Sequence, residues 1–165
     1  MTLNTNLSHA KRAIDYVRTK MTIGASNKPL DFITSFGGSL LCVIATRNTD
    51  IALTVGVIPK WIRAEAAKAE TVGCGNCGEQ AALAFVKLYD TYGARPIDYM
   101  ARNNANHAFV VIGRKNGSKA DDYTTWGDSA VICDPWHNKV YPASEVLIKM
   151  YGGGAFRPSS LFRIS

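Results

Sequence analysis

The pattern of apolar residues changes at Gly93, and this change limits the fold more than any other feature of the chain. Before it, apolar residues recur at helical spacing over residues 9–21, 60–70 and 78–92. After it, short runs rich in β-branched and aromatic residues alternate with polar or glycine-bearing segments, which is typical of strands. Helices followed by strands predict an α+β fold, in which the helices pack on an antiparallel sheet.

Local signals indicate where the helices begin and end. Ser8 is suited to cap the first helix, and Pro59 is suited to the first turn of the second. Gly73 and Gly93 are expected to end the second and third helices. Residues 30–58 are mainly apolar, with a turn-like Arg-Asn-Thr-Asp at 47–50, and fit both buried helices and buried strands, so their structure stays open.

The expected strands are residues 95–100, 107–113, 130–133 and 139–141. No repeat or linker divides the chain, so we expect one domain over residues 1–165. Its N-terminal part, residues 1–72, is mainly helical or ambiguous, and residues 73–165 hold one further helix and the sheet. A chain of 165 residues buries enough surface to fold without a metal or disulfide framework.

The chain carries 19 Lys and Arg against 13 Asp and Glu, a net charge of +6. These basic residues are spread along the chain rather than grouped with aromatic residues, which argues against nucleic acid as a partner. An acidic protein partner would suit the excess charge. No apolar stretch approaches the ~20 residues of a membrane span, and the N-terminus lacks the pattern of a secretory signal.

The segment GCGNCGEQA, residues 73–81, places Cys77 where the third helix should begin. The free backbone N–H groups and the dipole of a helix start favour an anion, so they lower the pKa of a thiol placed there. Glycines on both sides leave room for a substrate backbone to approach. Cys77 is therefore the candidate nucleophile.

His107 and Asp134 are the candidate partners of this thiol. His107 opens the strand 107–113, and Asp134 follows the strand 130–133. If these strands pair, the aspartate can accept a hydrogen bond from the imidazole and orient it as the base of a thiol nucleophile. His137 is the alternative imidazole, although it follows Asp-Pro-Trp and is expected on a turn.

These motifs together resemble the papain-like and transglutaminase-like cysteine hydrolases. GNCGEQA corresponds to the nucleophile helix, HAFVVIG to the histidine strand, and CDPW to the aspartate. The resemblance covers residues 73–141 and is closest to the papain-fold toxin and effector domains of bacteria. It implies Cys77 as nucleophile, His107 as base and Asp134 as the orienting acid, with no cofactor and no metal.

The resemblance also implies an activity. Members of this group deamidate a glutamine of a target protein, and others are proteases or transglutaminases with the same three residues. Deamidation is the expectation here. The target would be a protein of another cell, reached through a secretion system or as part of a larger toxin. Such a chain would act in a reducing cytosol and would pair with a cognate immunity or carrier protein.

The oxyanion donor is where the chain departs from the papain pattern. That pattern has a glutamine a few residues before the cysteine, but residues 70–72 are Glu-Thr-Val. The helix-start amides, or the side chain of Asn76, are left for this role. Gln80 is expected to line the cleft, Trp136 to form its floor or to pack nearby, and Glu79 to face solvent.

Two other hypotheses assign the cysteines differently. Cys74 and Cys77 form a C-x-x-C pair, as in a thioredoxin-like redox site, although no buried strand precedes it. Cys74, Cys77, Cys133 and His137 would suit a structural zinc ion, and the protein would then be a binding module without catalysis. If Cys77 is the nucleophile, Cys74 is dispensable, and Cys42 and Cys133 are expected in the core.

Overall fold

The computed structural model describes residues 1–25, 27–28, 30, 33, 38–47, 56–102, 106–149 and 156–165. Within them, helices fill the N-terminal part and an antiparallel sheet fills the C-terminal part, so the predicted α+β class is confirmed. The α-helices are α1 (Leu3–Lys20), α3 (Gly38–Arg47), α4 (Lys60–Val72), α5 (Cys77–Tyr92) and the short α6 (Val146–Lys149). Residues 48–55, part of the ambiguous region, lie outside the described residues.

The sheet has the order β4-β3-β2-β1-β5, with all neighbours antiparallel. Its strands are β1 (Ile97–Arg102), β2 (His107–Ile112), β3 (Val131–Asp134), β4 (Lys139–Pro142) and β5 (Pro158–Ile164). The first four correspond to the expected runs. The edge strand β5 was not expected, because the sequence PSSLFRI has no clean alternation of apolar and polar residues.

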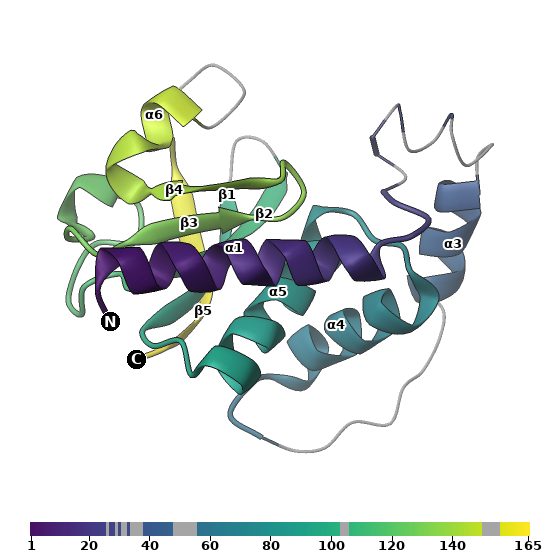
Figure 1. The fold of residues 1–165 in the computed structure, drawn as a ribbon, viewed down its shortest axis with the longest axis horizontal. Coiled ribbons are helices and arrows are strands. Elements are labelled where there is room, and N and C mark those ends of the chain that lie inside the picture. The colour runs from purple at the N-terminus through teal and green to yellow at the C-terminus, as the bar shows by residue number, and fades with distance from the viewer. Residues whose placement is uncertain are drawn as a thin grey trace.

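Alternation along the strands creates a core on each face of the sheet. On one face, α5 packs on β1 and β2 while α1 packs on β3 and β4 (Figure 1). The residues of this core include Val110, Ile112, Val131 and Cys133. On the other face, a second core lies beneath the loop after β2 and the short helices before β5. Its residues include Phe109, Val111, Ile132 and Tyr141, which alternate along the strands with those of the first core.

Helix α1 begins earlier than the sequence indicated. Its N-cap is Thr2, whose hydroxyl accepts a hydrogen bond from the Thr5 amide at 3.3 Å, and Ser8 is exposed in the middle of the helix. Tertiary contacts explain the extra turns, because the buried Asn6 side chain donates to the Ser129 carbonyl at 2.8 Å and Leu3 packs against the core.

A buried carboxylate holds the edge strand β5 in place. Asp98 is fully buried and accepts hydrogen bonds from Arg114 at 2.7 Å, from Ser160 at 2.9 Å and from Arg163. Since Ser160 and Arg163 belong to β5 and Asp98 belongs to β1, this network fixes the pairing of the two strands. Buried charges of this kind are tolerated only when they are fully paired.

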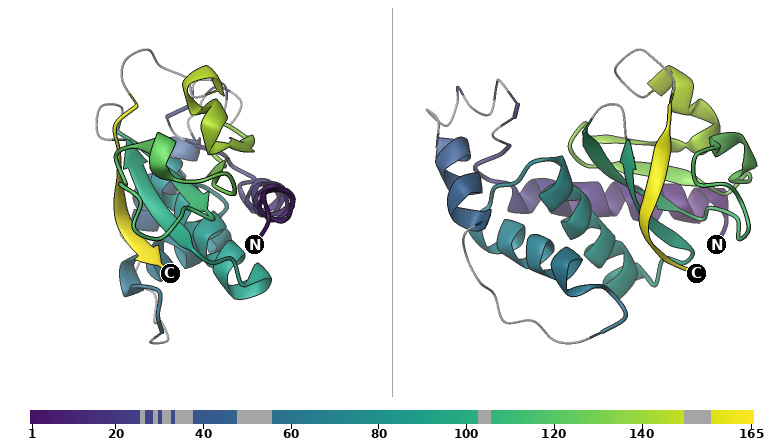
Figure 2. Two further views of the ribbon diagram at one scale, coloured as in Figure 1. Left: turned by 90° about the vertical axis from the view of Figure 1, so that its left-hand side faces the viewer. Right: turned by 180° about the vertical axis from the view of Figure 1, so that it is seen from behind.

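Helices α3 and α4 lie at the end of the molecule remote from β3 and β4 (Figures 1 and 2). Helix α4 ends at Gly73, whose φ of +80° is the left-handed conformation that favours glycine. No described helix combines the length and the apolar character that crossing a bilayer requires.

Candidate active site

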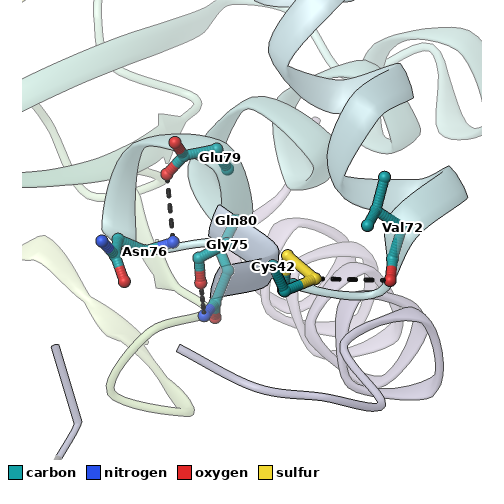
Figure 3. The surroundings of a disulfide bond; sticks show 7 residues. Cys42, Val72, Gly75, Asn76, Glu79 and Gln80 are labelled. Atoms are coloured by element: carbon teal, nitrogen blue, oxygen red, sulfur yellow. Dashed lines mark hydrogen bonds between the residues drawn. A yellow bond between two sulfur atoms is a disulfide. The ribbon is translucent and has the colours of Figure 1, made fainter. Parts of the chain in front are cut away.

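Cys77 is the first residue of α5, as the sequence predicted. Asn76 and Glu79 form a capping box at this helix start, in which the Glu79 carboxylate accepts a hydrogen bond from the Asn76 amide at 3.0 Å (Figure 3). Only glycine fits at position 75, because a Cβ there would lie 2.6 Å from the Cβ of Glu79. The glycine-rich sequence therefore serves the tight start of the helix.

Tyr99 fastens this helix start to the sheet. Its hydroxyl donates to the carbonyl of Gly78 at 3.0 Å, and its ring is packed edge-on against Trp61 at 5.2 Å between centroids. Helix α5 is thus held at its first turn by a residue of β1, beside the strand that carries His107.

His107 and Asp134 meet at the end of the sheet. The imidazole Nε2 donates to Asp134 Oδ2 at 2.7 Å, and both side chains are buried. Strand pairing explains the contact, because β2 pairs Val110 with Cys133. One step further along this register, Asp134 lies opposite Phe109. Phe109 is two residues from His107, so the side chains of His107 and Asp134 lie on the same face of the sheet.

The thiol of Cys77 interacts with the imidazole of His107. Burial by itself raises the pKa of this thiol, but the hydrogen bond with His107, the backbone N–H groups of Ala108 and Gly78, and the charge of His107 outweigh it. The pKa of Cys77 is therefore lowered. Because Nε2 of His107 is engaged by Asp134, Nδ1 is the ring atom left for the sulfur.

The pKa values of the other two groups favour the charged forms as well. Burial disfavours the imidazolium, yet the hydrogen bonds with Asp134 and Cys77 raise the pKa of His107 to about 9. Burial likewise disfavours the carboxylate, but hydrogen bonds from His107 and His137 lower the pKa of Asp134 to about 2. A thiolate, an imidazolium and a carboxylate therefore stabilise one another in a row.

His137 contacts the carboxylate rather than the thiol. Its Nδ1 donates to Asp134 Oδ2 at 2.7 Å, and its backbone amide donates to Oδ1 at 3.1 Å. Asp134 is thus both the partner of His107 and the first residue of the turn that its Asp-Pro sequence indicates.

A cleft of about 1020 Å³ opens over Cys77 and His107. A smaller cavity of about 220 Å³ adjoins the same two residues on the side of Trp136 and His137. The larger cleft extends toward Trp61 and Leu161, which are 43% and 55% exposed and offer an apolar rim. An extended polypeptide segment can therefore pass over the thiol, with room on both sides of it.

Two of the other three predicted cleft residues line a cavity and the third does not. Asn76 lines the larger cleft and Trp136 lines the smaller cavity. Gln80 lies elsewhere: it is buried, and its side-chain amide donates back to the Gly75 carbonyl at 2.8 Å, which stabilises the loop before the helix (Figure 3). Glu79 is buried as the capping partner of Asn76, so the expectation that it faces solvent is wrong.

Sequence reasoning missed several residues of the cleft because they come from distant segments. Asn27 lines both cavities from the loop after α1, and the buried Arg102 lines both from the end of β1. Trp61 and Leu161 come from α4 and from the unexpected strand β5. Leu161 has no partner in the register with β1, where a bulge separates the pairs Tyr99–Phe162 and Met100–Ser160.

A disulfide joins Cys42 of α3 to Cys74, three positions before Cys77 (Figure 3). The expectation of a core residue is therefore wrong for Cys42, which is only partly buried. It holds for Cys133, which is fully buried beneath α1, where its thiol donates to the Ala10 carbonyl. A C-x-x-C redox pair would require a bond between Cys74 and Cys77, but Cys74 is bonded to Cys42.

The zinc set inferred from the sequence is not assembled, because Cys74 is disulfide-bonded and Cys133 lies in the core beneath α1. Within the described part of the chain, one group of three side chains brings metal-ligand atoms within 4.8 Å of one another: His107, Asp134 and His137. Both rings there already hydrogen bond to the carboxylate, so a metal ion would have to displace the contacts that orient His107.

The chain was compared with protein-family models, with curated proteins and with solved structures, and none of them matches it.

Proposed function

We propose that the protein is a cysteine hydrolase that acts on a protein target by thiol acyl transfer, most of all by deamidating a glutamine side chain. The observation that carries the proposal is the continuous network from Cys77 through His107 to the buried Asp134, located at the floor of an open cleft. Residues 73–141 resemble papain-like hydrolases, and this resemblance favours the same chemistry.

In the proposed reaction, the Cys77 thiolate attacks the carbon of the carboxamide, and the carbonyl oxygen becomes an oxyanion. When the carbonyl re-forms, the C–N bond breaks and His107 gives its proton to the departing ammonia. The thioester left on Cys77 is then attacked by water, from which His107 takes a proton. The products are ammonia, a glutamate side chain and the original thiolate–imidazolium pair.

Asp134 supports both halves of this cycle without reacting. Its carboxylate fixes the ring so that Nδ1 faces the sulfur, and its charge stabilises the protonated ring. The same groups serve a protease, in which a chain amine leaves, or a transglutaminase, in which a lysine amine replaces water. The choice of deamidation rests on the resemblance to bacterial toxin and effector domains.

The same resemblance supports the proposed setting. The target would be a protein of another cell, and a cognate immunity or carrier protein would accompany the chain before delivery. Disulfides form in oxidising compartments and are opened in the cytosol. The Cys42–Cys74 bond therefore suits the stage before delivery, and action in a reducing cytosol requires that the site work without it.

The test uses the purified chain with casein and with the peptide benzyloxycarbonyl-glutaminylglycine. Deamidation releases ammonia and raises the intact mass of casein by about 1 Da for each site, whereas proteolysis gives fragments and transglutamination gives cross-links. Cys77→Ala should abolish the reaction, and Cys133→Ser, a change of the other free cysteine, should retain it. If casein and the peptide both stay unmodified, the chain does not deamidate accessible glutamines and the proposed deamidation is wrong.

A further inference from the structure

We propose that Asn27 is a further catalytic residue, whose side-chain N–H donates to the oxyanion formed by attack of Cys77. The inference rests on the proposed acyl transfer and deepens it, because it assigns the side-chain donor that residues 70–72 do not provide. Asn27 comes from the loop after α1, a segment to which sequence reasoning assigned no role.

Backbone pairing brings this loop to the nucleophile. The amide of Ile23 donates to the Gly73 carbonyl at 2.9 Å, and the amide of Gly75 donates to the Gly24 carbonyl at 3.2 Å. Residues 23–24 therefore run alongside the segment that leads into Cys77. The chain then continues to Asn27, which lines both cavities beside Cys77 and His107.

Two hydrogen bonds fix the Asn27 side chain and backbone. The indole Nε1 of Trp136 donates to Asn27 Oδ1 at 2.9 Å, and the Asn27 amide donates to Asn76 Oδ1 at 3.3 Å. The ammonium of Lys28 lies over the Trp136 ring at 5.1 Å, which holds the indole from its other side. With Oδ1 engaged, the side-chain nitrogen Nδ2 presents two N–H groups, and no described residue accepts from them.

Two other donors near the thiol, the backbone amide of Asn76 and the side-chain amide of Gln80, are already engaged. The Asn76 amide donates to Glu79, and the Gln80 side chain donates to the Gly75 carbonyl. The amides of Gly78 and Ala108 are directed at the sulfur of Cys77. A backbone donor at the same place is the amide of Cys77 itself, which as the first residue of α5 has no acceptor within its helix. One backbone and one side-chain N–H make a complete oxyanion site.

The experiment separates stabilisation of an oxyanion from positioning of the thiol. Amide hydrolysis and reversible addition of an aldehyde both turn a carbonyl oxygen into an anionic or hydrogen-bonded oxygen, whereas alkylation by iodoacetamide does not. Asn27→Ala should lower kcat for ammonia release from benzyloxycarbonyl-glutaminylglycine about 100-fold with little change in KM. It should weaken inhibition by acetyl-glycinal about 10-fold and leave the rate of Cys77 alkylation within about twofold.

Asn27→Asp is the second variant, because it keeps Oδ1 and the volume of the side chain but replaces the donor with an anionic oxygen. It should lose as much kcat as Asn27→Ala while keeping the thermal unfolding temperature of the wild type. Asn4→Ala, a change on the exposed face of α1, is the matched control and should leave kcat, aldehyde inhibition and the alkylation rate unchanged.

Two results would overturn the assignment. Alkylation that slows as much as hydrolysis would make Asn27 a residue that only positions Cys77. Unchanged hydrolysis and unchanged aldehyde affinity would remove it from the site altogether. If the wild type releases no ammonia, the aldehyde and alkylation measurements still decide the role of Asn27, and the failure then belongs to the proposed function alone.

Discussion

His107 donates to Asp134 through Nε2 at 2.7 Å, and this single contact determines which ring atom faces the nucleophile. Nδ1 is left for Cys77, whose thiol also lies 3.7 Å from the Asn106 carbonyl. The aspartate thus acts on the thiol from a distance, through the orientation and the charge of the ring.

The hydrolytic rate should fall at alkaline pH. The pKa of His107 is raised to about 9, so the ring keeps its proton below that pH and loses it above. A neutral ring cannot protonate departing ammonia, and kcat/KM should therefore decline with a midpoint near 9. Alkylation of Cys77 needs no proton donor, so its rate should rise to a plateau with a midpoint below 9.0, because the pKa of the thiol is lowered. A hydrolytic decline centred near 6.5 would contradict the raised pKa.

Asp134→Asn should shift this alkaline limb to lower pH. The carboxylate raises the pKa of His107 by its hydrogen bond and its charge, and the amide supplies neither a full charge nor an equally strong acceptor. We expect kcat/KM at neutral pH to fall about 100-fold or more, as is common when an orienting carboxylate is lost. The pH profile is the discriminating measurement, since a purely structural defect would lower activity at all pH values alike.

The two histidines on Asp134 should differ sharply in effect. His107→Ala removes the group that contacts the thiol and should reduce activity to the background. His137→Ala removes only a second donor to the carboxylate, and a loss of about threefold to tenfold in kcat/KM is expected. Equal losses would indicate that His137 takes part in proton transfer.

Iodoacetamide should label Cys77 alone in the folded protein. Its pKa is lowered and it lines the cleft, whereas burial raises the pKa of Cys133 far above the usual range and α1 covers it. Intact-mass and peptide analysis should show one adduct at neutral pH and a second only after unfolding. Rapid labelling of Cys133 in the folded state would contradict the packing of α1 on β3.

Opening the Cys42–Cys74 bond should weaken the fold more than the chemistry. The bond joins residues 32 apart, a separation for which loop closure contributes about 3–4 kcal/mol to the free energy of unfolding. The loop before Cys77 is also held by the backbone bonds of Ile23 and Gly24, so kcat/KM of Cys42→Ser should stay within about threefold of wild type. Denaturant unfolding with and without reductant measures the first effect, and a tenfold or larger loss of activity would contradict the second.

The parts of the fold that local pattern determines could be predicted from the sequence. Helices α4 and α5 end at Gly73 and Gly93 as expected, because a left-handed residue is needed there and glycine supplies it. Strands β2 and β3 carry runs of β-branched residues that identify them. The edge strand β5 escaped because its bulge at Leu161 interrupts the alternation by which strands are recognised.

In the candidate site, Cys77, His107 and Asp134 lie near the ends of helices and strands, where a single sequence motif indicates both the residue and its place in the fold. Asn27 and Arg102 are different, because only tertiary pairing brings their segments to the cleft. The disulfide could not be foreseen either, since Cys42 lies in the apolar region whose secondary structure the pattern left open. Gln80 was misplaced because a helix-start polar residue can turn inward as easily as toward a cleft.

The disulfide also determines the product of proteolysis between Cys42 and Cys74. Cys42 and Cys74 lie on either side of a segment that contains the whole of α4, and Cys77 follows the second cysteine by three positions. A protease that cleaves anywhere between them produces two polypeptides, one with α1 and the other with the whole of α5 and the sheet, yet the two remain a single covalent molecule. On a denaturing gel the nicked protein would therefore migrate as an intact chain, and as two fragments only after a reductant opens the disulfide.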